Sequence, residues 1–435
     1  MAKDRAVVGI DVGTSKIATL IATIPTEGPA HIIGVSTVPS RGLRKGQIVD
    51  IEEATAAILS SLESAERMAG YQVTEGYVGL GGAHISSQNS RGVVAVADPD
   101  KEITVSDIQR VIDAAKAVSL PSSREIIHVL PRQFTVDSQD GIKDPVGMTG
   151  VRLEVDTHLI TGGITAIRNL EKCLSEVGVN VVGFVFGGLA SSTAVLTETE
   201  KELGVVLVDI GGGTTDICIF VEGALSYSTV IPIGARNITN DLAIGLRLSL
   251  ESAEKIKIFL SQETKEMTYP LEVEKKTLKK EKKDDDQMDL SSLALTEGTT
   301  SVSRRTLVEG IIRPRLNEIF TMVAMEIKKS NFAGMTPAGL VITGGGARTI
   351  NMVDAAKRSL AMPVRVGMPN GITGLIDEVI DPTFSSAVGL VLYGAKDVEI
   401  GHHTPTLERF GQMTKKIPIK GVVGKVVNLV KSFLP

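Results

Sequence analysis

Two short segments of the chain repeat one arrangement of an aspartate, glycines and hydroxyl residues. They are residues 9–16, GIDVGTSK, and residues 208–216, VDIGGGTTD. Glycines let backbone N–H groups approach an anion without a Cβ in the way, and Thr and Ser add hydroxyl donors. The pattern therefore predicts two phosphate-binding turns, with the candidate residues Gly13, Thr14, Ser15, Lys16, Gly211, Gly212, Gly213, Thr214 and Thr215.

Each turn follows an aspartate whose carboxylate cannot touch a phosphate without repulsion. Mg²⁺ keeps several of its waters while it bridges phosphate oxygens, so Asp11 and Asp209 are expected to hold such an ion through water, from opposite sides. No residue is assigned as catalytic. Asp209 and Asp216 are the candidates for polarising a water, although a hairpin aspartate such as Asp216 equally serves to satisfy backbone donors.

A third glycine turn, TGGGAR at residues 343–348, follows an apolar strand pattern and precedes a helix. A helix N-terminus with free backbone donors can hold a nucleotide, so Gly344, Gly345, Gly346 and Arg348 are further candidates. Taken singly, each glycine turn is explained as well by tight packing between a strand and a helix. Together, the three turns predict a nucleotide site between two similar halves of the chain.

The composition favours sheets covered by helices. The 435 residues are 43% apolar but only 3% aromatic, without Trp, so the cores must be built from aliphatic residues, and the length suffices for two to four globular units. The net charge of −5 argues against nucleic acid as a partner. Cys173 and Cys218 lack the spacing of a zinc site and are expected in the core.

Local patterns predict the elements that position the turns. Residues 6–24 and 205–231 alternate β-branched runs with glycine turns, as strands do, and residues 51–70 predict an amphipathic helix that ends at a glycine. Single helices are expected over 240–261 and 306–329. The apolar run after residue 5 is too short for a signal peptide, and no run reaches the ~20 residues of a membrane-spanning helix, so a cytoplasmic protein is expected.

Residues 84–161 show a different pattern, of short strands around one helix, and predict an inserted α+β subdomain. The helix is expected near 106–118, with Thr104 as its N-cap. The core of a first lobe is expected at 1–83 and 162–197, with the insertion at 84–161. The core of a second lobe is expected at 198–231 and 304–396, and its smaller subdomain at 232–303, with a charged, mobile loop at about 275–303. A linker at 397–420 and a terminal helix at 421–435 complete the expected division.

The motifs together resemble the superfamily of actin, heat-shock chaperones and sugar kinases and, within it, the FtsA family of bacterial cell-division proteins. The resemblance covers nearly the whole chain and rests on the segments GIDVGTSK, GLASSTAVL, LGVVLVDIGGGTTDI, VIPIGARNITNDLA, VITGGGA and the terminal helix. It implies an α/β, actin-like two-lobed fold with a duplicated phosphate-binding core, in which the insertion at 84–161 occupies the place of the FtsA subdomain. It also implies ATP and Mg²⁺ as ligands.

The resemblance assigns further residues and partners. Glu254 and Lys257 match the superfamily's adenosine helix, in which the Glu reaches the ribose hydroxyls and the Lys lies beside the base. FtsA proteins polymerise and tether the FtsZ ring to the inner face of the membrane at the division site. The implied partners are therefore further copies of the chain, inner-membrane lipids, the carboxy-terminal peptide of FtsZ, with Arg304 and Arg305 as candidate contacts, and other divisome proteins at the inserted subdomain.

The last residues of the chain predict an amphipathic helix. At 100° per residue, residues 421–435 place their apolar side chains on one arc, and a helix of about 20 Å is too short to cross a bilayer but suited to lie in its interface. A helix packed on the protein's own core is the alternative, which the polar stretch at 397–420 disfavours. The membrane-binding candidates are Val422, Val423, Lys425, Val426, Val427, Leu429, Val430, Lys431, Phe433 and Leu434.

Two other functions within the superfamily are the alternatives to a cell-division role. A pilus-assembly ATP-binding protein shares the core and the insertion but normally lacks the terminal anchor, and a small-molecule kinase needs an Asp general base and has no use for such a tail. Hydrolysis itself requires a group that orients the attacking water. Residues 186–190, FGGLA, hold no polar side chain where actin and the chaperones carry Gln or Glu, so at most slow ATP hydrolysis is expected.

Overall fold

The computed structural model describes residues 5–400, apart from 27, 98–99, 101 and 267–285. Residues up to Ala395 form one compact unit. Of the second unit, which begins at Lys396, the structure describes only the end of a helix, to Ile400. The helix therefore continues past the expected start of a linker at 397, and the membrane-binding candidates at 421–435 lie outside the described residues.

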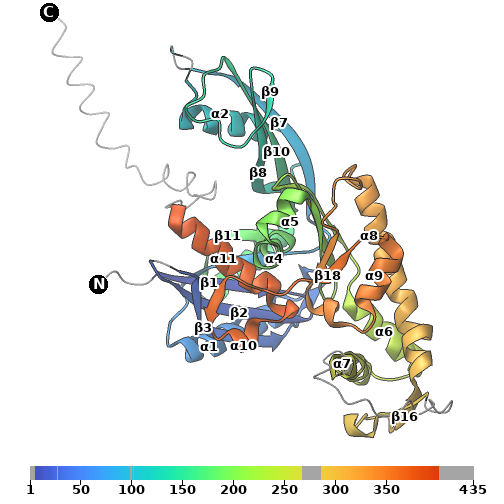
Figure 1. The fold of residues 1–435 in the computed structure, drawn as a ribbon. Helices are drawn as coiled ribbons and strands as arrows, with labels where there is room; N and C mark the ends of the chain where they lie inside the picture. The colour runs from blue at the N-terminus through green and yellow to red at the C-terminus, as the bar shows by residue number, and fades with distance from the viewer. Residues whose placement is uncertain (1–4, 27, 98–99, 101, 267–285, 401–435) are drawn as a thin grey trace, which may run out of the picture. The chain divides into compact units, whose positions relative to one another are not determined.

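Two sheets repeat one strand arrangement (Figure 1). The first sheet has the order β11 (Asn180–Phe186), β6 (Glu75–Leu80), β1 (Arg5–Val12), β2 (Lys16–Ile24), β3 (Ala30–Pro39) and β19 (Ile372–Gly374). The second has the order β14 (Ala224–Ile231), β13 (Thr215–Val221), β12 (Val205–Ile210), β17 (Leu340–Thr343) and β18 (Val364–Val366). We call each sheet with its helices a lobe, the first lobe containing β1 and the second containing β12.

The repeat extends to strand direction. In each lobe an antiparallel hairpin, β1–β2 or β12–β13, is flanked by a third antiparallel strand on one side and by a parallel strand, β6 or β17, on the other. The hairpin turns contain the two predicted phosphate motifs. The duplicated core expected from the sequence is therefore confirmed.

Helices cover the sheets because their apolar residues recur at helical spacing. In α1, Gly70 ends the helix at a φ of 61°, as predicted, and Asp50 caps the first turn. The helices are α1 (Ile51–Ala69), α3 (Ile164–Glu176), α4 (Gly187–Val195), α5 (Glu198–Leu203), α6 (Ala235–Leu246), α7 (Leu250–Glu266), α8 (Arg313–Lys329), α9 (Met352–Leu360), α10 (Ile376–Val379) and α11 (Ser385–Ile400). A π-helical stretch, Thr306–Ile312, precedes α8, and single 3-10 turns lie at Ser291–Leu293, Gly345–Arg348 and Pro382–Phe384.

Two predictions about these elements were wrong. The helix expected over 240–261 is two helices, because Arg247 adopts a left-handed φ of 58° that ends α6, and the Ser249 hydroxyl accepts the N–H of Ser252 at the start of α7. Gly245 lies in the last turn of α6, but the residues between the two helices, 247–249, include neither Gly nor Pro. The expected loop at about 275–303 contains, within its described part, a short hairpin of β15 (Gln287–Asp289) and β16 (Ser301–Ser303).

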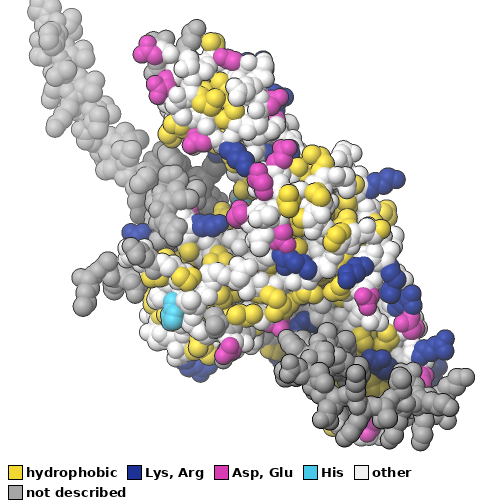
Figure 2. Space-filling model, in the orientation of Figure 1, with side chains coloured by type: hydrophobic (Ala, Val, Ile, Leu, Met, Phe, Trp, Pro, Cys, Tyr) yellow, Lys and Arg dark blue, Asp and Glu magenta, His cyan; other side chains and the backbone are white. Residues whose placement is uncertain are grey.

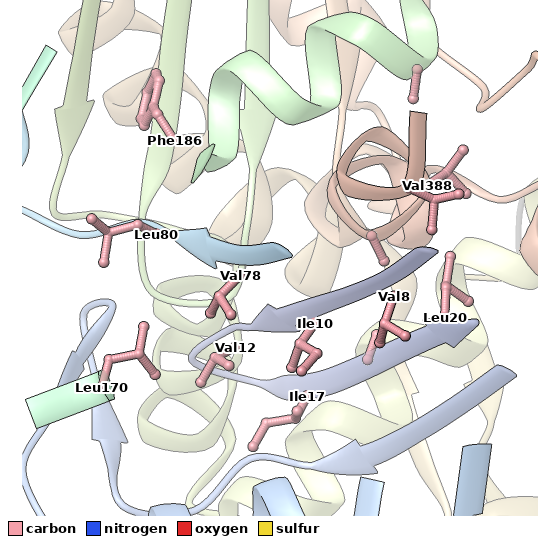
Figure 3. Close-up of a cluster of buried hydrophobic side chains, with 14 of the residues drawn as sticks. Val8, Ile10, Val12, Ile17, Leu20, Val78, Leu80, Leu170, Phe186 and Val388 are labelled. Carbon is pink, nitrogen blue, oxygen red and sulfur yellow. The ribbon is translucent and has the colours of Figure 1, made fainter. Parts of the chain in front are cut away.

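The aliphatic core of the first lobe lies between its sheet and helices. Figure 3 shows Val8, Ile10 and Val12 of β1 beside the neighbouring strands, with Val388 of α11 close by. Both cysteines are buried and unbridged, as expected. Helices α4 and α11 cross so closely that a Cβ on Gly389 would lie 1.9 Å from the Ala190 carbonyl oxygen, and this crossing joins the parts of the chain that bear the two lobes.

The insertion is a four-stranded antiparallel sheet with one helix. The sheet has the order β7 (Ser86–Ala95), β10 (Arg152–Gly163), β8 (Arg124–Val136) and β9 (Gln139–Ile142). Helix α2 (Val105–Lys116) packs on it, and Thr104 caps the helix by accepting the Asp107 N–H, as predicted. A separate small core, which includes Ile103, Val111 and Leu153, holds the insertion together.

A network of hydrogen bonds connects the insertion to β14, an edge strand of the second lobe. Asn89 Nδ2 donates to the Ser226 carbonyl at 3.2 Å, so its Oδ1 accepts Nδ1–H of His158 at 2.7 Å. The Ser228 hydroxyl then donates to His158 Nε2 at 2.9 Å. Burial lowers the pKa of His158 to about 3, which keeps this imidazole neutral.

Candidate functional site

One cavity of about 330 Å³ lies between the two lobes and is lined by both hairpin turns. It is also lined by the 344–346 turn and by one face of α7. The residues proposed from the sequence that line it are Asp11, Gly13, Thr14, Ser15, Lys16, Asp209, Gly211, Gly212, Thr214, Asp216, Glu254, Lys257, Gly344, Gly345, Gly346 and Arg348.

The first turn is held by its own backbone and by a neighbouring loop. The Gly13 N–H donates to the Lys16 carbonyl at 3.0 Å, and the Thr14 hydroxyl oxygen accepts the Gly46 N–H at 2.9 Å. A hydroxyl that accepts one bond still has its own proton to donate. Lys16 donates from Nζ to the Thr383 carbonyl and lies 4.2 Å from the centre of the Phe384 ring, and burial lowers its pKa.

The second turn packs directly on the first. A Cβ on Gly212 would lie 2.2 Å from Ser15 Oγ, and a Cβ on Gly213 would lie 2.9 Å from Thr14 Oγ1. Gly213 is thus buried against the first turn and does not line the cavity. Thr215, also predicted to bind phosphate, does not line the cavity either, because it belongs to β13 and its hydroxyl donates to the Ile233 carbonyl at 2.8 Å.

Three carboxylates line the floor of the cavity. The Ser191 and Ser386 hydroxyls donate to Asp209, from α4 and α11. Asp11 has no hydrogen-bond partner among the described residues, and burial raises its pKa to about 6, with Lys16 lowering it and Asp209 raising it further. Asp216, next to Gly187, has an Oδ1 without a partner in the described part of the chain, and burial raises its pKa well above the usual range.

These carboxylates fit a cation that is held through water. Within the described ranges, no group of three or more acidic, His or Cys side chains is close enough to hold a metal ion directly. Mg²⁺ needs few protein ligands when phosphate oxygens and waters complete its shell. Asp209, which is buried, and Asp11, which is half-buried, face one cavity from opposite hairpins, and the glycine turns carry backbone donors. This arrangement matches that requirement.

The far end of the cavity is formed by α7 and the third turn. Glu254, Lys257, Ile258 and Ser261 line it from one helix face. The Lys257 ammonium bonds to Glu254 at 2.7 Å and is only 8% exposed. Arg348 pairs with Asp381 at 3.4 Å. Gly344 has a φ of 81° and lies so near Asp209 that a Cβ would be 2.1 Å from its carboxylate, which explains the requirement for glycine.

Several lining residues were missed by the sequence motifs. Gly46 comes from the loop between β4 (Leu43–Arg44) and β5 (Gln47–Ile48), while Thr383 and Ser386 precede and begin α11. Arg236 lies in the first turn of α6 and is exposed. None of these belongs to a glycine motif; only the closeness of Gly42 and Gly46, both at positive φ, marks the first loop as a tight turn.

The partner-peptide candidates lie elsewhere. Arg304 and Arg305 precede the π-helical stretch, where their backbone N–H groups donate to Asp286, and neither lines the cavity. No helix in the described residues is both long and apolar enough to span a membrane. Side chains of both charges lie over the face drawn in Figure 2, which also shows hydrophobic side chains on the insertion.

Two family models match the chain. The model of the SHS2 domain inserted in FtsA matches residues 82–161, and the model of cell division protein FtsA matches residues 206–389. The first match coincides with the four-stranded insertion. The second contains the second phosphate turn, α7 and the third turn.

Similar curated proteins bear the name cell division protein FtsA. The one from Pseudomonas aeruginosa is 40% identical over 390 residues, which cover 90% of this chain and 89% of the relative. The one from Bacillus subtilis is 37% identical over 400 residues, which cover 92% and 86%. The one from Escherichia coli K12 is 36% identical over 397 residues, which cover 90% of each chain.

Solved structures share the fold at low identity. The PilM-PilN type IV pilus biogenesis complex aligns with a TM-score of 0.62 at 13% identity, over 89% of this chain and 98% of that chain. MreB5 of Spiroplasma citri bound to ADP aligns with a TM-score of 0.50 at 13% identity, over 91% and 98%. These likenesses show the actin-like fold alone. The identity to the curated relatives goes further, and on it the chain belongs to the FtsA family of cell-division proteins.

Proposed function

We propose that this FtsA-family chain binds ATP with Mg²⁺ in the cavity between its lobes. One observation carries the proposal: both glycine turns, both turn aspartates and the third glycine turn line a single cavity. Its volume of about 330 Å³ is typical of small-molecule sites. The solved MreB5 of the same fold is bound to ADP, which supports a nucleotide as the ligand.

Each part of the cavity has a role in this proposal. The Gly13 and Gly211 N–H groups donate within their own turns, so the backbone N–H groups of Thr14, Ser15, Gly212 and Thr214 bind the phosphates. Asp11 and Asp209 hold the waters of Mg²⁺, which neutralises phosphate charge when bound. Glu254 binds the ribose, and the 344–348 turn borders the base. A ligand that touches both turns favours the closed arrangement of the lobes.

Slow hydrolysis is part of the same proposal. Gly187 lines the cavity beside Asp216 and offers no side chain to orient a water. Asp216 is the remaining candidate, and burial raises the pKa of its carboxyl well above the usual range. The nucleotide then acts mainly by fixing the conformation.

We propose that the protein acts at the cytoplasmic face of the cell membrane, at the division site. ATP-bound chains polymerise, residues 421–435 anchor them to lipid, and the second lobe binds the FtsZ carboxy-terminal peptide near Arg304 and Arg305. Four exposed valines of the insertion, Val93, Val105, Val146 and Val151, suit contacts with other divisome proteins. The boundaries 1–83, 84–161, 162–197, 198–231 and 232–303 are retained as proposed subdomain limits. The limit 304–396 is changed, because β19 pairs with β3 and Val388 of α11 lies in the core of the first lobe.

Co-sedimentation with anionic vesicles and FtsZ tests this function, with ATP, lipid and FtsZ omitted in turn. The full chain is expected to bring FtsZ down with vesicles when ATP is present. Deleting residues 421–435 should abolish vesicle binding and leave ATP binding intact. Replacing Arg304 and Arg305 with Glu should release FtsZ alone. Unchanged pelleting of the truncated chain would refute the membrane anchor.

A further inference from the structure

The insertion contacts the lobe to which it is not covalently joined. Residues 84–161 leave the first lobe after β6 and return to it at α3, yet β7, β8 and β10 pack on β14, an edge strand of the second lobe's sheet. The insertion is therefore a second connection between the lobes, in addition to the crossing of α4 and α11.

Side chains of the insertion bond to carbonyl groups on the open edge of β14. The Ser87 hydroxyl donates to the Ser228 carbonyl at 2.6 Å, and Asn89 Nδ2 donates to the Ser226 carbonyl at 3.2 Å. His158 accepts from the Ser228 hydroxyl, and the two β14 serines, Ser226 and Ser228, are 0% and 2% exposed. These carbonyls, which an edge strand would otherwise offer to another strand, are thus bonded within the chain.

Arg132 of β8 adds two contacts with the second lobe. Its Nε–H donates to Ser226 Oγ at 3.0 Å, and its guanidinium carbon lies 5.4 Å from the centre of the Phe332 ring, in the loop that follows α8. Lys143 of the insertion also forms an ion pair with Glu202 at 2.9 Å, but both side chains are exposed, so this pair contributes little. The docking of the insertion therefore depends mainly on the contacts of Arg132 and on the bonds to β14.

The base of the insertion is fixed to the first lobe. Arg124 Nη2 donates to the carbonyls of His84 and Thr161, both at 2.9 Å, and so ties together the segments that enter and leave the insertion. His128 Nε2 of β8 accepts the Phe186 N–H at 3.0 Å, from β11 of the first lobe. Because the insertion is held to the first lobe in this way, a movement of the second lobe must disturb the contacts at β14.

Both attachments of the insertion lie next to a phosphate turn. Val230 of β14 pairs with Asp216 of the second turn. Gly82 precedes the insertion, and a Cβ there would lie 3.0 Å from the Gly46 carbonyl oxygen, while the Gly46 N–H donates to Thr14 of the first turn. The arrangement that packs the two turns together is thus the one in which the insertion bonds to β14. A hydrogen bond tolerates little change in distance or angle, so a rotation that separates the turns should break these bonds.

From these contacts we infer that the docking of the insertion on β14 stabilises the closed arrangement of the lobes, so that the docked insertion and bound ATP favour each other. The inference rests on the proposed ATP binding and goes beyond it, because it makes the insertion a regulator of the cavity. A partner protein that draws the insertion away from β14 would lower the ATP affinity, and ATP would oppose that partner by the same factor. The competing explanation is that the insertion only covers an edge strand, which predicts no dependence on nucleotide.

Calorimetric titration of the full chain with Mg²⁺-ATP compares two serines of β7. Ser87 donates across the interface, whereas the Ser90 hydroxyl donates to the Ala115 carbonyl at 2.8 Å inside the insertion. Ser87→Ala should weaken ATP binding about threefold, because one bond that stabilises the closed arrangement is lost, and Ser90→Ala should leave it unchanged. Combining Ser87→Ala with Asn89→Ala and Arg132→Ala should weaken ATP binding at least about tenfold.

Hydrogen exchange of residues 86–90 and 224–231 shows whether the insertion is docked. In the natural chain, Mg²⁺-ATP should slow exchange in both segments. In the triple variant, exchange in 224–231 should be faster than in the natural chain, and saturating Mg²⁺-ATP should no longer slow it.

Each contrary result has a distinct meaning. Faster exchange in 224–231 of the triple variant, with an ATP affinity within about twofold of the natural chain, would overturn the inference and leave ATP binding in place. Equal weakening by Ser87→Ala and Ser90→Ala would also overturn it, since a loss of stability inside the insertion would then explain both. If the triple variant does not fold, the two single serine variants decide the question. A natural chain that does not bind ATP would refute the proposed function and the inference with it.

Discussion

The two glycine turns share a sequence plan but differ in what their glycines accommodate. In the second lobe, Gly212 and Gly213 face Ser15 and Thr14 of the other turn, at distances that leave no room for a Cβ. In the first lobe, a Cβ on Gly13 would instead meet the Lys16 carbonyl of its own turn at 2.9 Å. The second turn is thus built to receive the first, whereas Gly13 serves the geometry of its own hairpin.

The aspartates differ in the same sense. Asp209 is fixed by hydroxyls from both connecting helices, while Asp11 has no hydrogen-bond partner among the described residues. One carboxylate is therefore oriented by the fold. The other has no such hydrogen bonds, and the charges of Lys16 and Asp209 act on it.

The largest expected effect comes from closing the gap between the turns. Gly212→Val should abolish measurable ATP binding, a loss of at least about a hundredfold, because the branched side chain would displace Ser15 and separate the lobes. Gly334→Val is the control, since nothing lies within 4 Å of a Cβ there. ATP affinity within threefold of the natural chain for Gly212→Val would break the comparison.

The stability of the chain should depend on pH through His128, which helps to hold α4 and thereby the Ser191 that bonds to Asp209. His128 Nε2 accepts the Phe186 N–H at 3.0 Å just before α4, which carries Ser191, and burial lowers its pKa to about 4. The unfolded chain binds this proton near pH 6.5, so stability should fall by up to about 3 kcal/mol as the pH drops from 6.5 to 4.

Urea unfolding at several pH values measures that slope. His128→Gln should make the slope shallower by this amount, because glutamine does not titrate and its carbonyl oxygen can still accept the N–H, whereas His158, whose pKa burial also lowers, continues to contribute. If the natural chain and the variant lose stability in parallel over this range, His128 does not anchor α4 in its neutral form.

The two aspartates should respond oppositely to amidation. Asp11→Asn removes a buried charge that faces Asp209, so the chain without nucleotide should gain about 1 to 2 kcal/mol of stability while its Mg²⁺-dependent ATP affinity falls. Asp209→Asn should not gain stability, because its amide oxygen, in the place of Oδ2, accepts the Ser191 and Ser386 hydroxyls more weakly than the carboxylate does. Thermal unfolding with and without Mg²⁺-ATP measures both. Equal responses would remove the distinction between them.

The smallest expected effect concerns the Thr14 hydroxyl. Thr14→Val deprives the Gly46 N–H of its acceptor and the phosphate of a donor, and should weaken ATP binding about three- to tenfold. Thr14→Ser should retain the affinity of the natural chain. A Val variant that binds ATP as the Ser variant does would show that the Gly46 loop contributes nothing to the site.

The sequence predicted those parts of the site that are contiguous in the chain. These parts are both hairpins, the third turn and the pair Glu254 and Lys257. They are short motifs, and the residue types in each are enough to indicate its chemistry. Gly46, Ser191 and Ser386 could not be predicted, because each acts through a partner that is distant in sequence and only packing brings them together. Thr215 was included wrongly, since the alternation of β13 turns its hydroxyl toward Ile233.

Hydrogen exchange of the backbone N–H groups of residues 9–16 and 208–216, with and without Mg²⁺-ATP, is the most direct test of the central claim. If one triphosphate is bound by both turns, its addition should slow exchange in both segments at the same nucleotide concentration, and Gly212→Val should cancel the protection of both. Protection confined to one segment, or absent from both at saturating nucleotide, would contradict the account.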